Sequence, residues 1–180
     1  MRFITSLLAS SLIGITAAYA EMTVTSKDLT QGKPMANEQV FNGFGCKGKN
    51  ISPQLVWSGA PADTKSFAIM AYDPDAPTGS GWWHWTVFNV PADVSEVQTG
   101  ASGEGKLPAG AVEGRTDFGA SGYGGACPPE GDKPHHYQFT VYALSVDKLP
   151  LDEAAPGAMV GFFVRANTLD QASIEVTYGR

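Results

Sequence analysis

The fold is decided by the stretch Ser66-Phe67-Ala68-Ile69-Met70-Ala71-Tyr72, which continues into Asp73-Pro74-Asp75-Ala76-Pro77. Residues 67–72 are apolar or aromatic at odd and even positions alike, a pattern typical of a strand that is covered on both faces. The prolines end the strand, because proline fixes its own φ and has no N–H to donate. We therefore expect a strand that is covered on both faces, with the carboxylates of Asp73 and Asp75 held in a turn at its end.

Segments of similar character lie on both sides of this strand. Runs rich in β-branched and aromatic residues between turn residues indicate strands. The expected strands are Met22–Ser26, Leu55–Trp57, Trp83–Val90, Gln138–Val146 and Ser173–Tyr178. One helix is expected from Pro156 to about Gln171, with a packing face formed by Met159, Phe162, Phe163 and Ala166. The sequence thus predicts a mostly β fold with one or few short helices in a single domain.

A glycine-rich connection of unusual length covers residues 100–131. Loops of this length in a compact domain are either functional or disordered. The aromatic residues Phe118 and Tyr123 favour an ordered, functional loop.

Residues 1–20 have the three parts of a cleavable signal peptide: one positive charge at Arg2, an apolar run, and the small-x-small site Ala18-Tyr19-Ala20. The alternative is a membrane anchor. It is disfavoured because the run is interrupted by Ser and Thr and is shorter than the roughly 20 apolar residues of a spanning helix. We expect cleavage after Ala20, a folded domain over residues 21–180, no membrane span, and a periplasmic or secreted location.

Composition argues against several classes of partner. The formal net charge is −6 at pH 7, and the 12 Lys and Arg residues form no cluster, which disfavours nucleic acid and anionic lipid surfaces. The segment Gly43-Phe44-Gly45-Cys46-Lys47-Gly48 matches the pattern G-x-G-x-x-G, but loop residues follow it. Without a helix N-terminus to hold a pyrophosphate, the match does not predict a dinucleotide site. No cofactor is expected.

Cys46 and Cys127 are the only cysteines. In an oxidising compartment they are a candidate disulfide, and the alternative is a pair of buried thiols. A zinc site is disfavoured, because neither cysteine has a second one two to four residues away.

Polar clusters coincide with the ends of the expected strands. After the turn at Asp73 and Asp75 comes Trp82-Trp83-His84-Trp85, and after Gly125–Gly131 comes His135-His136-Tyr137. All three histidines of the chain therefore lie at strand entrances. Two interpretations remain open at this point, a binding site and ordinary turn chemistry.

Strand alternation predicts which of these side chains converge. It places His135, Tyr137 and Phe139 on one face of their strand and His136 on the other. In the same way it groups His84 with Thr86 and Phe88. Imidazoles, a phenol and loop amides are donors for an anion, and the two aspartates can hold the imidazoles charged or accept from an ammonium group.

Asp73-Pro74-Asp75-Ala76-Pro77 followed by His84, together with Pro128-Pro129-x-Gly131 and His135-x-Tyr137, resembles the phosphatidylethanolamine-binding protein family. The bacterial Raf-kinase-inhibitor-like branch of the YbhB/YbcL type, and its exported members above all, is most similar. The resemblance implies a Greek-key-like β-fold with a small anion pocket, binding rather than catalysis, and a possible homodimer. The pocket residues carried over by it are Asp73, Asp75, Trp82, His84, Gly125, Pro129, His135 and Tyr137. Because Cys127 lies inside the second motif, a disulfide to Cys46 would be tied to the pocket.

Three functions are compared on this basis. The first is a non-catalytic periplasmic binding protein for a small phosphate-bearing anion or a phospholipid headgroup. The second is a secreted interaction or inhibitor module that acts on a kinase, protease or host protein. The third is an enzyme with Asp73, Asp75, His84 and His135 as metal ligands or as an acid/base set. The third is the least favoured, because the sequence holds no evident activated nucleophile.

Overall fold

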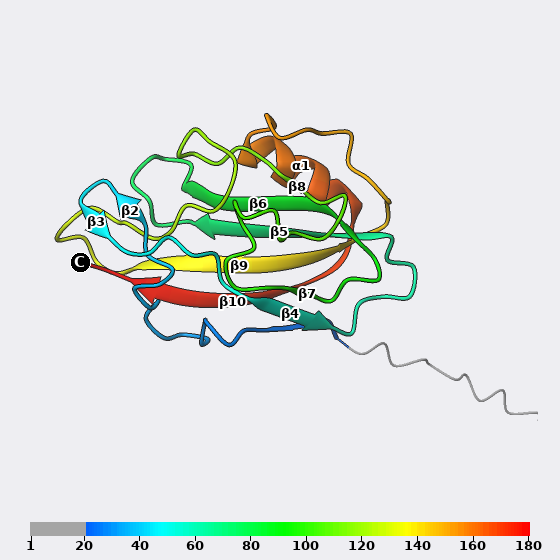
Figure 1. Ribbon diagram of the computed structural model, residues 1–180, viewed down its shortest axis with the longest axis horizontal. Coiled ribbons are helices and arrows are strands. Elements are labelled where there is room, and N and C mark those ends of the chain that lie inside the picture. Colours follow the sequence, from blue (N-terminus) through cyan, green and yellow to red (C-terminus); the bar gives the residue numbers. More distant parts are fainter. Residues whose placement is uncertain (1–20) are drawn as a thin grey trace, which may run out of the picture.

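The computed structural model describes residues 21–180, so the expected signal peptide and its cleavage site lie outside the described residues. A five-stranded antiparallel sheet forms the centre, in the order β10-β9-β5-β6-β8 (Figure 1). Its strands are β5 (Ser66–Asp73), β6 (Trp82–Pro91), β8 (Val112–Glu113), β9 (His135–Leu144) and β10 (Thr168–Tyr178). Three short strands make a second sheet in the order β1-β4-β7, namely β1 (Thr23–Thr25), β4 (Leu55–Ser58) and β7 (Glu96–Val97). The hairpin of β2 (Asn42–Gly43) and β3 (Cys46–Lys47) and the helix α1 (Gly157–Asn167) complete the mostly β single domain that the sequence predicts.

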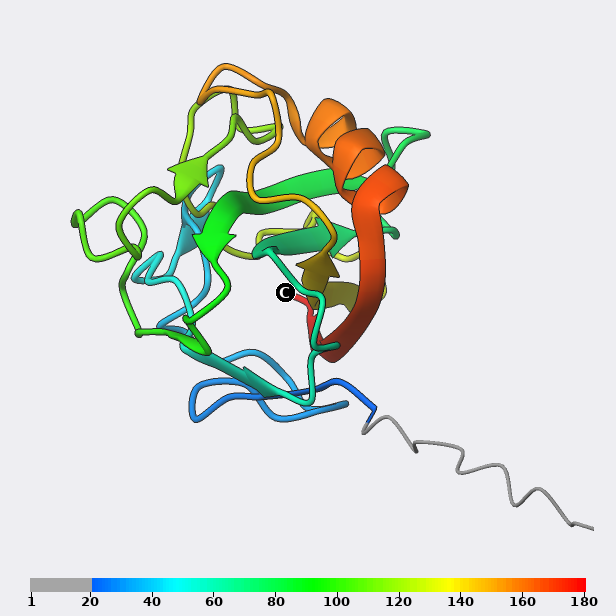
Figure 2. The same ribbon diagram turned by 90° about the vertical axis from the view of Figure 1, so that its right-hand side faces the viewer.

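The central strand β5 is buried on both faces, as its composition predicts. Phe67, Ile69 and Ala71 pack into a large cluster between the two sheets, whereas Ala68 and Met70 pack into a second cluster beneath α1. The two clusters correspond to the layers seen end-on in Figure 2, where α1 covers one face of the sheet. Burial on both sides fixes the register of β5 and therefore the position of the turn that follows it.

The helix differs from the prediction in length and in orientation. It ends at Asn167 and not near Gln171, because Thr168 already pairs with Leu144 of β9. The last turn is closed by side chains, since Asn167 Nδ2 donates to Phe163 O and Thr168 Oγ1 to Val164 O, both at 2.8 Å.

The buried face of α1 consists of Gly157, Val160, Gly161 and Val164, while Met159 and Phe162 of the predicted packing face are exposed. The glycines explain this orientation. A Cβ on Gly157 would lie 2.4 Å from the Trp83 ring, so only this face allows the helix to lie against the sheet. No helix within residues 21–180 is long and apolar enough to cross a membrane.

Candidate functional site

A cavity of about 220 Å³ opens at the end of the sheet where β5 stops and β6 and β9 begin. The β2–β3 hairpin lies at the same end of the molecule, on the left of Figure 1. Polar groups of Asp73, His84, His135 and Tyr137 lie among apolar walls. The walls are Phe44, Ala76, Pro77, Trp82, Phe118, Cys127, Pro128 and Pro129, with Thr78 beside them.

Asp73 is the last residue of β5 and is buried, and its carboxylate is fully engaged by the protein. Oδ1 accepts the backbone N–H of Asp75 at 2.8 Å and of Ala76 at 3.1 Å, which closes the turn that the prolines begin. Oδ2 lies 2.7 Å from His135 Nδ1. The carboxylate therefore holds the turn and one imidazole in place, rather than presenting a free charge to the cavity.

His135 is held between two carboxylates. Besides its contact with Asp73, its Nε2 lies 3.6 Å from Asp132 Oδ2, and the imidazole is buried. Its ring stacks near Tyr137 at a centroid distance of 6.5 Å. The strand alternation predicted for His135, Tyr137 and Phe139 is confirmed, since all three are buried while His136 is exposed.

A β-bulge directs His84 into the cavity. Ala71 pairs with Trp85 and Tyr72 with Trp83, so His84 is the extra residue of β6 at this point. The bulge changes the simple alternation, and the prediction that His84 shares a face with Phe88 is wrong. Phe88 packs in the cluster beneath α1, whereas the His84 ring lies 5.1 Å from that of Tyr137 on the opposite face. Bulges commonly re-aim a side chain beside a functional site.

The protonation of His84 follows from its contacts. Nδ1 lies 2.7 Å from the carbonyl oxygen of Gly124 and must therefore carry a hydrogen. Burial lowers the pKa of His84 below its usual value and outweighs the opposing effects of that hydrogen bond and of the carboxylates of Asp73 and Asp117. At neutral pH the ring is then uncharged, and the lone pair of Nε2 is left for a ligand.

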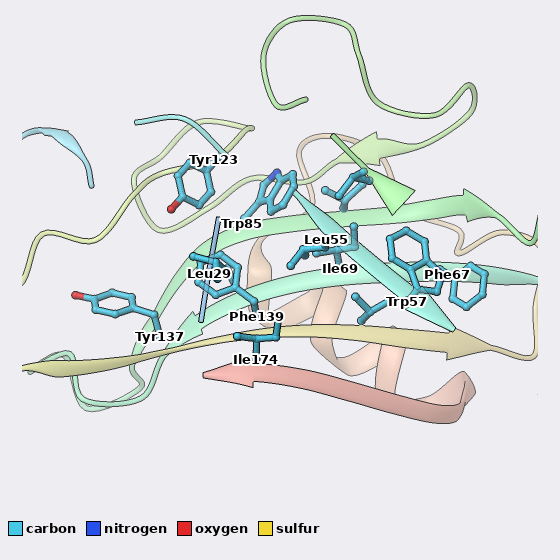
Figure 3. Close-up of a cluster of buried hydrophobic side chains, with 14 of the residues drawn as sticks. Leu29, Leu55, Trp57, Phe67, Ile69, Trp85, Tyr123, Tyr137, Phe139 and Ile174 are labelled. Carbon is cyan, nitrogen blue, oxygen red and sulfur yellow. The ribbon is translucent and has the colours of Figure 1, made fainter. Parts of the chain in front are cut away.

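Tyr137 contributes a buried hydroxyl that is unsatisfied in hydrogen bonding within the described residues. Its side chain is 2 % exposed, and its hydroxyl has no hydrogen-bond partner within residues 21–180. Figure 3 shows Tyr137 at the edge of the main core cluster, with the hydroxyl directed away from the other labelled side chains. Burial raises the pKa of Tyr137, so the phenol keeps its proton and can donate it in a hydrogen bond. A buried polar group without a partner in the protein is uncommon and is explained by an ordered water molecule, an ion or a ligand.

Two of the eight residues expected in the pocket do not line the cavity. Asp75 turns outward to His136, whose backbone N–H and Nδ1 lie 2.8 and 2.7 Å from its Oδ2. This hydrogen bond lowers the pKa of Asp75 and raises that of His136. Gly125 lies behind the cavity, where a Cβ would be only 2.1 Å from Gln39 O, so it permits a close packing of loops rather than a contact with a ligand.

Two of the wall residues, Phe44 and Phe118, were not assigned to the pocket by sequence reasoning. Phe44 of the β2–β3 turn stacks on Phe118 of the glycine-rich connection at 5.8 Å. The predicted disulfide between Cys46 and Cys127 is present and ties the hairpin to Pro128 and Pro129. The six consecutive residues Gly43–Gly48 thus form a hairpin with no following helix, which agrees with the rejection of a dinucleotide site.

Of the four groups considered as metal ligands, Asp73, His84 and His135 line the cavity, and Asp75 does not. Asp73 is engaged by His135 and two amides, while Asp75 faces His136 outside the cavity. Within residues 21–180 no group of three or more His, Cys, Asp or Glu side chains is placed to hold a metal ion.

The comparisons with known proteins agree on one family. The profile of the family described as "Phosphatidylethanolamine-binding protein" matches residues 25–179. The chain is 54% identical over 170 residues to the UPF0098 protein YbcL of Escherichia coli (strain K12), covering 93% of each chain. It is 51% identical over 158 residues to YbhB of the same strain, covering 87% of this chain and 99% of YbhB.

A third relative and a solved structure extend the comparison. The putative lipoprotein LppC of Mycobacterium tuberculosis (strain ATCC 25618 / H37Rv) is 33% identical over 157 residues, which is 87% of this chain and 72% of LppC. The crystal structure of Escherichia coli YbcL, described as a new member of the mammalian PEBP family, superposes with a TM-score of 0.88 over 89% of this chain and 99% of that one. The family model over residues 25–179, the identity to YbcL and YbhB and the superposition on the YbcL structure show that the chain belongs to the phosphatidylethanolamine-binding protein family.

Proposed function

We propose that the protein binds a small phosphate-bearing ligand in this cavity, without transforming it, in the periplasm. The observation that carries the proposal is the buried Tyr137 hydroxyl, which has no partner within residues 21–180 and lines a cavity together with His84, whose Nδ1 donates to Gly124 O. A phosphate monoanion offers P=O acceptors for the phenol and a P–O–H donor for the imidazole. The cavity, at about 220 Å³, suits a headgroup or phosphomonoester rather than a whole lipid.

The carboxylates closest to the cavity are engaged by the protein. Asp73 would repel a phosphate, but its carboxylate is stabilised by hydrogen bonds from two amides and by its contact with His135 Nδ1. The acidic side chain Asp75 is outside the cavity. The polar groups left for a ligand are a hydroxyl and an imidazole, which bind an oxyanion by hydrogen bonds.

Three observations support a location outside the cytoplasm. The Cys46–Cys127 disulfide is of the kind that persists in oxidising compartments. The first twenty residues have the charge, apolar run and cleavage site of an export signal. A relative that is named a putative lipoprotein agrees with export.

Calorimetric titration with inorganic phosphate and with phosphoethanolamine tests the binding. We expect saturable binding with one site per chain, which His84→Phe weakens at least tenfold. Absence of heat for both ligands, or undiminished affinity in His84→Phe, would refute the proposal. Phosphorus NMR of bound phosphoethanolamine should show an unchanged ester after prolonged incubation, whereas release of phosphate would indicate an enzyme.

Export is tested separately with the full chain. We expect the product in the periplasmic fraction, with a mass that corresponds to a chain beginning at Glu21. Retention of residues 1–20 in the isolated protein would contradict the predicted cleavage.

A further inference from the structure

Phe44, at the mouth of the cavity, combines two unfavourable features. Its backbone has φ of 52°, in the left-handed region that a bulky side chain rarely adopts. Its side chain is also 69 % exposed. A glycine or asparagine would satisfy the same turn without strain. Strain of this kind persists where the surroundings enforce it and is concentrated at ligand sites.

The surroundings do hold this ring over the opening. Two residues later, Cys46 is joined to Cys127, which itself lines the cavity. Arg180 Nε donates to Pro128 O at 2.7 Å, and its Nη2 donates to Phe44 O at 3.3 Å, so the same side chain bridges both loops. The hairpin therefore cannot carry Phe44 away from the cavity without breaking these contacts.

The mouth and the interior of the cavity differ in chemistry. The interior offers the Tyr137 hydroxyl and the His84 imidazole. The mouth is aromatic, since Phe44 stacks on Phe118, and Trp82 meets the same ring edge-on at 5.5 Å. Inorganic phosphate has no apolar surface, so contact with these aromatic rings would not increase its affinity.

We infer that the natural ligand is a phosphomonoester with an apolar organic group, which packs against Phe44 while the phosphate occupies the interior. The inference rests on the proposed function, because it assumes that the phosphate lies beside Tyr137. The organic group can be an aryl ring or an alkyl chain, since both complement an exposed aromatic face. Contact with one aromatic ring corresponds to a gain of about two- to tenfold in affinity.

The test compares three probes by calorimetric titration: inorganic phosphate, phenyl phosphate and n-butyl phosphate. We expect both esters to bind the wild-type protein about two- to tenfold more tightly than inorganic phosphate does. The order of the two esters distinguishes an aryl from an alkyl preference. Phe44→Asn, which suits the left-handed turn, should remove this gain, so that the esters bind this variant no more tightly than inorganic phosphate does.

Phe162→Ala is the matched control, because Phe162 is 70 % exposed but lies on α1. It should leave the affinities for all three probes unchanged. Circular dichroism and the mass of the intact disulfide confirm that each variant is folded.

The outcomes separate the two proposals. Esters that bind no better than inorganic phosphate, or an equal loss for all probes in Phe44→Asn, overturn the inference while the phosphate site stands. Failure of every probe to bind the wild-type protein overturns both. A selective loss of ester affinity in Phe44→Asn supports both.

Discussion

The Tyr137 hydroxyl should act on stability and on binding in opposite directions. Without a ligand, a buried hydroxyl that has no partner within the described residues 21–180 destabilises the fold by about 1–3 kcal/mol relative to the ring C–H of a phenylalanine. We therefore expect Tyr137→Phe to raise the free energy of unfolding by about 1 kcal/mol. For a domain of this size the gain corresponds to about 2–4 °C in Tm.

The effect on binding has the reverse sign. A hydrogen bond from the phenol to a charged phosphate contributes about 1.5–3 kcal/mol, so its loss should weaken phosphate binding by roughly ten- to a hundredfold. The two measurements are denaturant unfolding of the ligand-free protein and titration with inorganic phosphate. Substitution of a cavity residue with a merely structural role would not change stability and phosphate affinity in opposite directions.

Tyr123→Phe is the matched control. Tyr123 is a buried tyrosine outside the cavity lining, and its hydroxyl donates to Gln39 O at 2.8 Å. Its removal leaves that carbonyl without this donor, so we expect a loss of about 1 kcal/mol in stability and unchanged phosphate affinity. The reasoning is refuted if Tyr137→Phe is less stable than the wild-type protein or binds phosphate equally well.

Three further predictions concern protons, the disulfide and a loop contact. Because His84 is neutral at pH 7, the complex must take up one proton that the free imidazole and a phosphate dianion lack. Phosphate affinity should therefore fall about tenfold per pH unit above pH 7. Titrations that give a constant Kd from pH 7 to 8.5 would contradict this. The double substitution Cys46→Ser/Cys127→Ser opens a loop of 81 residues, which should lower the free energy of unfolding in urea by about 4–5 kcal/mol. Reduction of the folded protein should also weaken phosphate binding. An unchanged Kd after reduction would show that the bridge does not shape the cavity. Gly125→Ala places a methyl group 2.1 Å from Gln39 O and should cost about 2 kcal/mol or more in urea unfolding, whereas wild-type stability would mean that the loop shifts freely.

The sequence predicts most of the sheet because burial leaves a periodic signal. Residues 67–72 read as a strand covered on both faces, and they pack into two separate clusters. The same reasoning fails at His84, because a β-bulge depends on the pairing of two strands and leaves no mark in the composition of either one. It also fails at α1, where small residues and valines face the sheet and the larger Met159 and Phe162 are exposed.

Phe44 could have been assigned to the site from the sequence by one additional step. Once Cys46 is paired with Cys127, a residue two positions away must lie near Pro128 and Pro129. Phe44 lies within the G-x-G-x-x-G match, and its aromatic character alone does not indicate a pocket residue. Arg180, by contrast, contacts the same loops because of where β10 lies in the sheet. No local sequence pattern indicates that position.

The proposal that the site holds a ligand without transforming it draws support from the internal hydrogen bonds of the site. A nucleophile needs an adjacent base to activate it. The Asp73 carboxylate accepts from two amides and contacts His135 Nδ1, and Nδ1 of His84 donates to Gly124 O. What remains for a ligand is one phenolic hydroxyl and one imidazole nitrogen, which can orient an oxyanion and share a proton with it. An imidazole nitrogen can also act as a general base, so the phosphorus NMR experiment decides between holding and hydrolysis. This is why phosphate release in the NMR experiment would weigh more heavily against the proposed function than weak binding of any single probe.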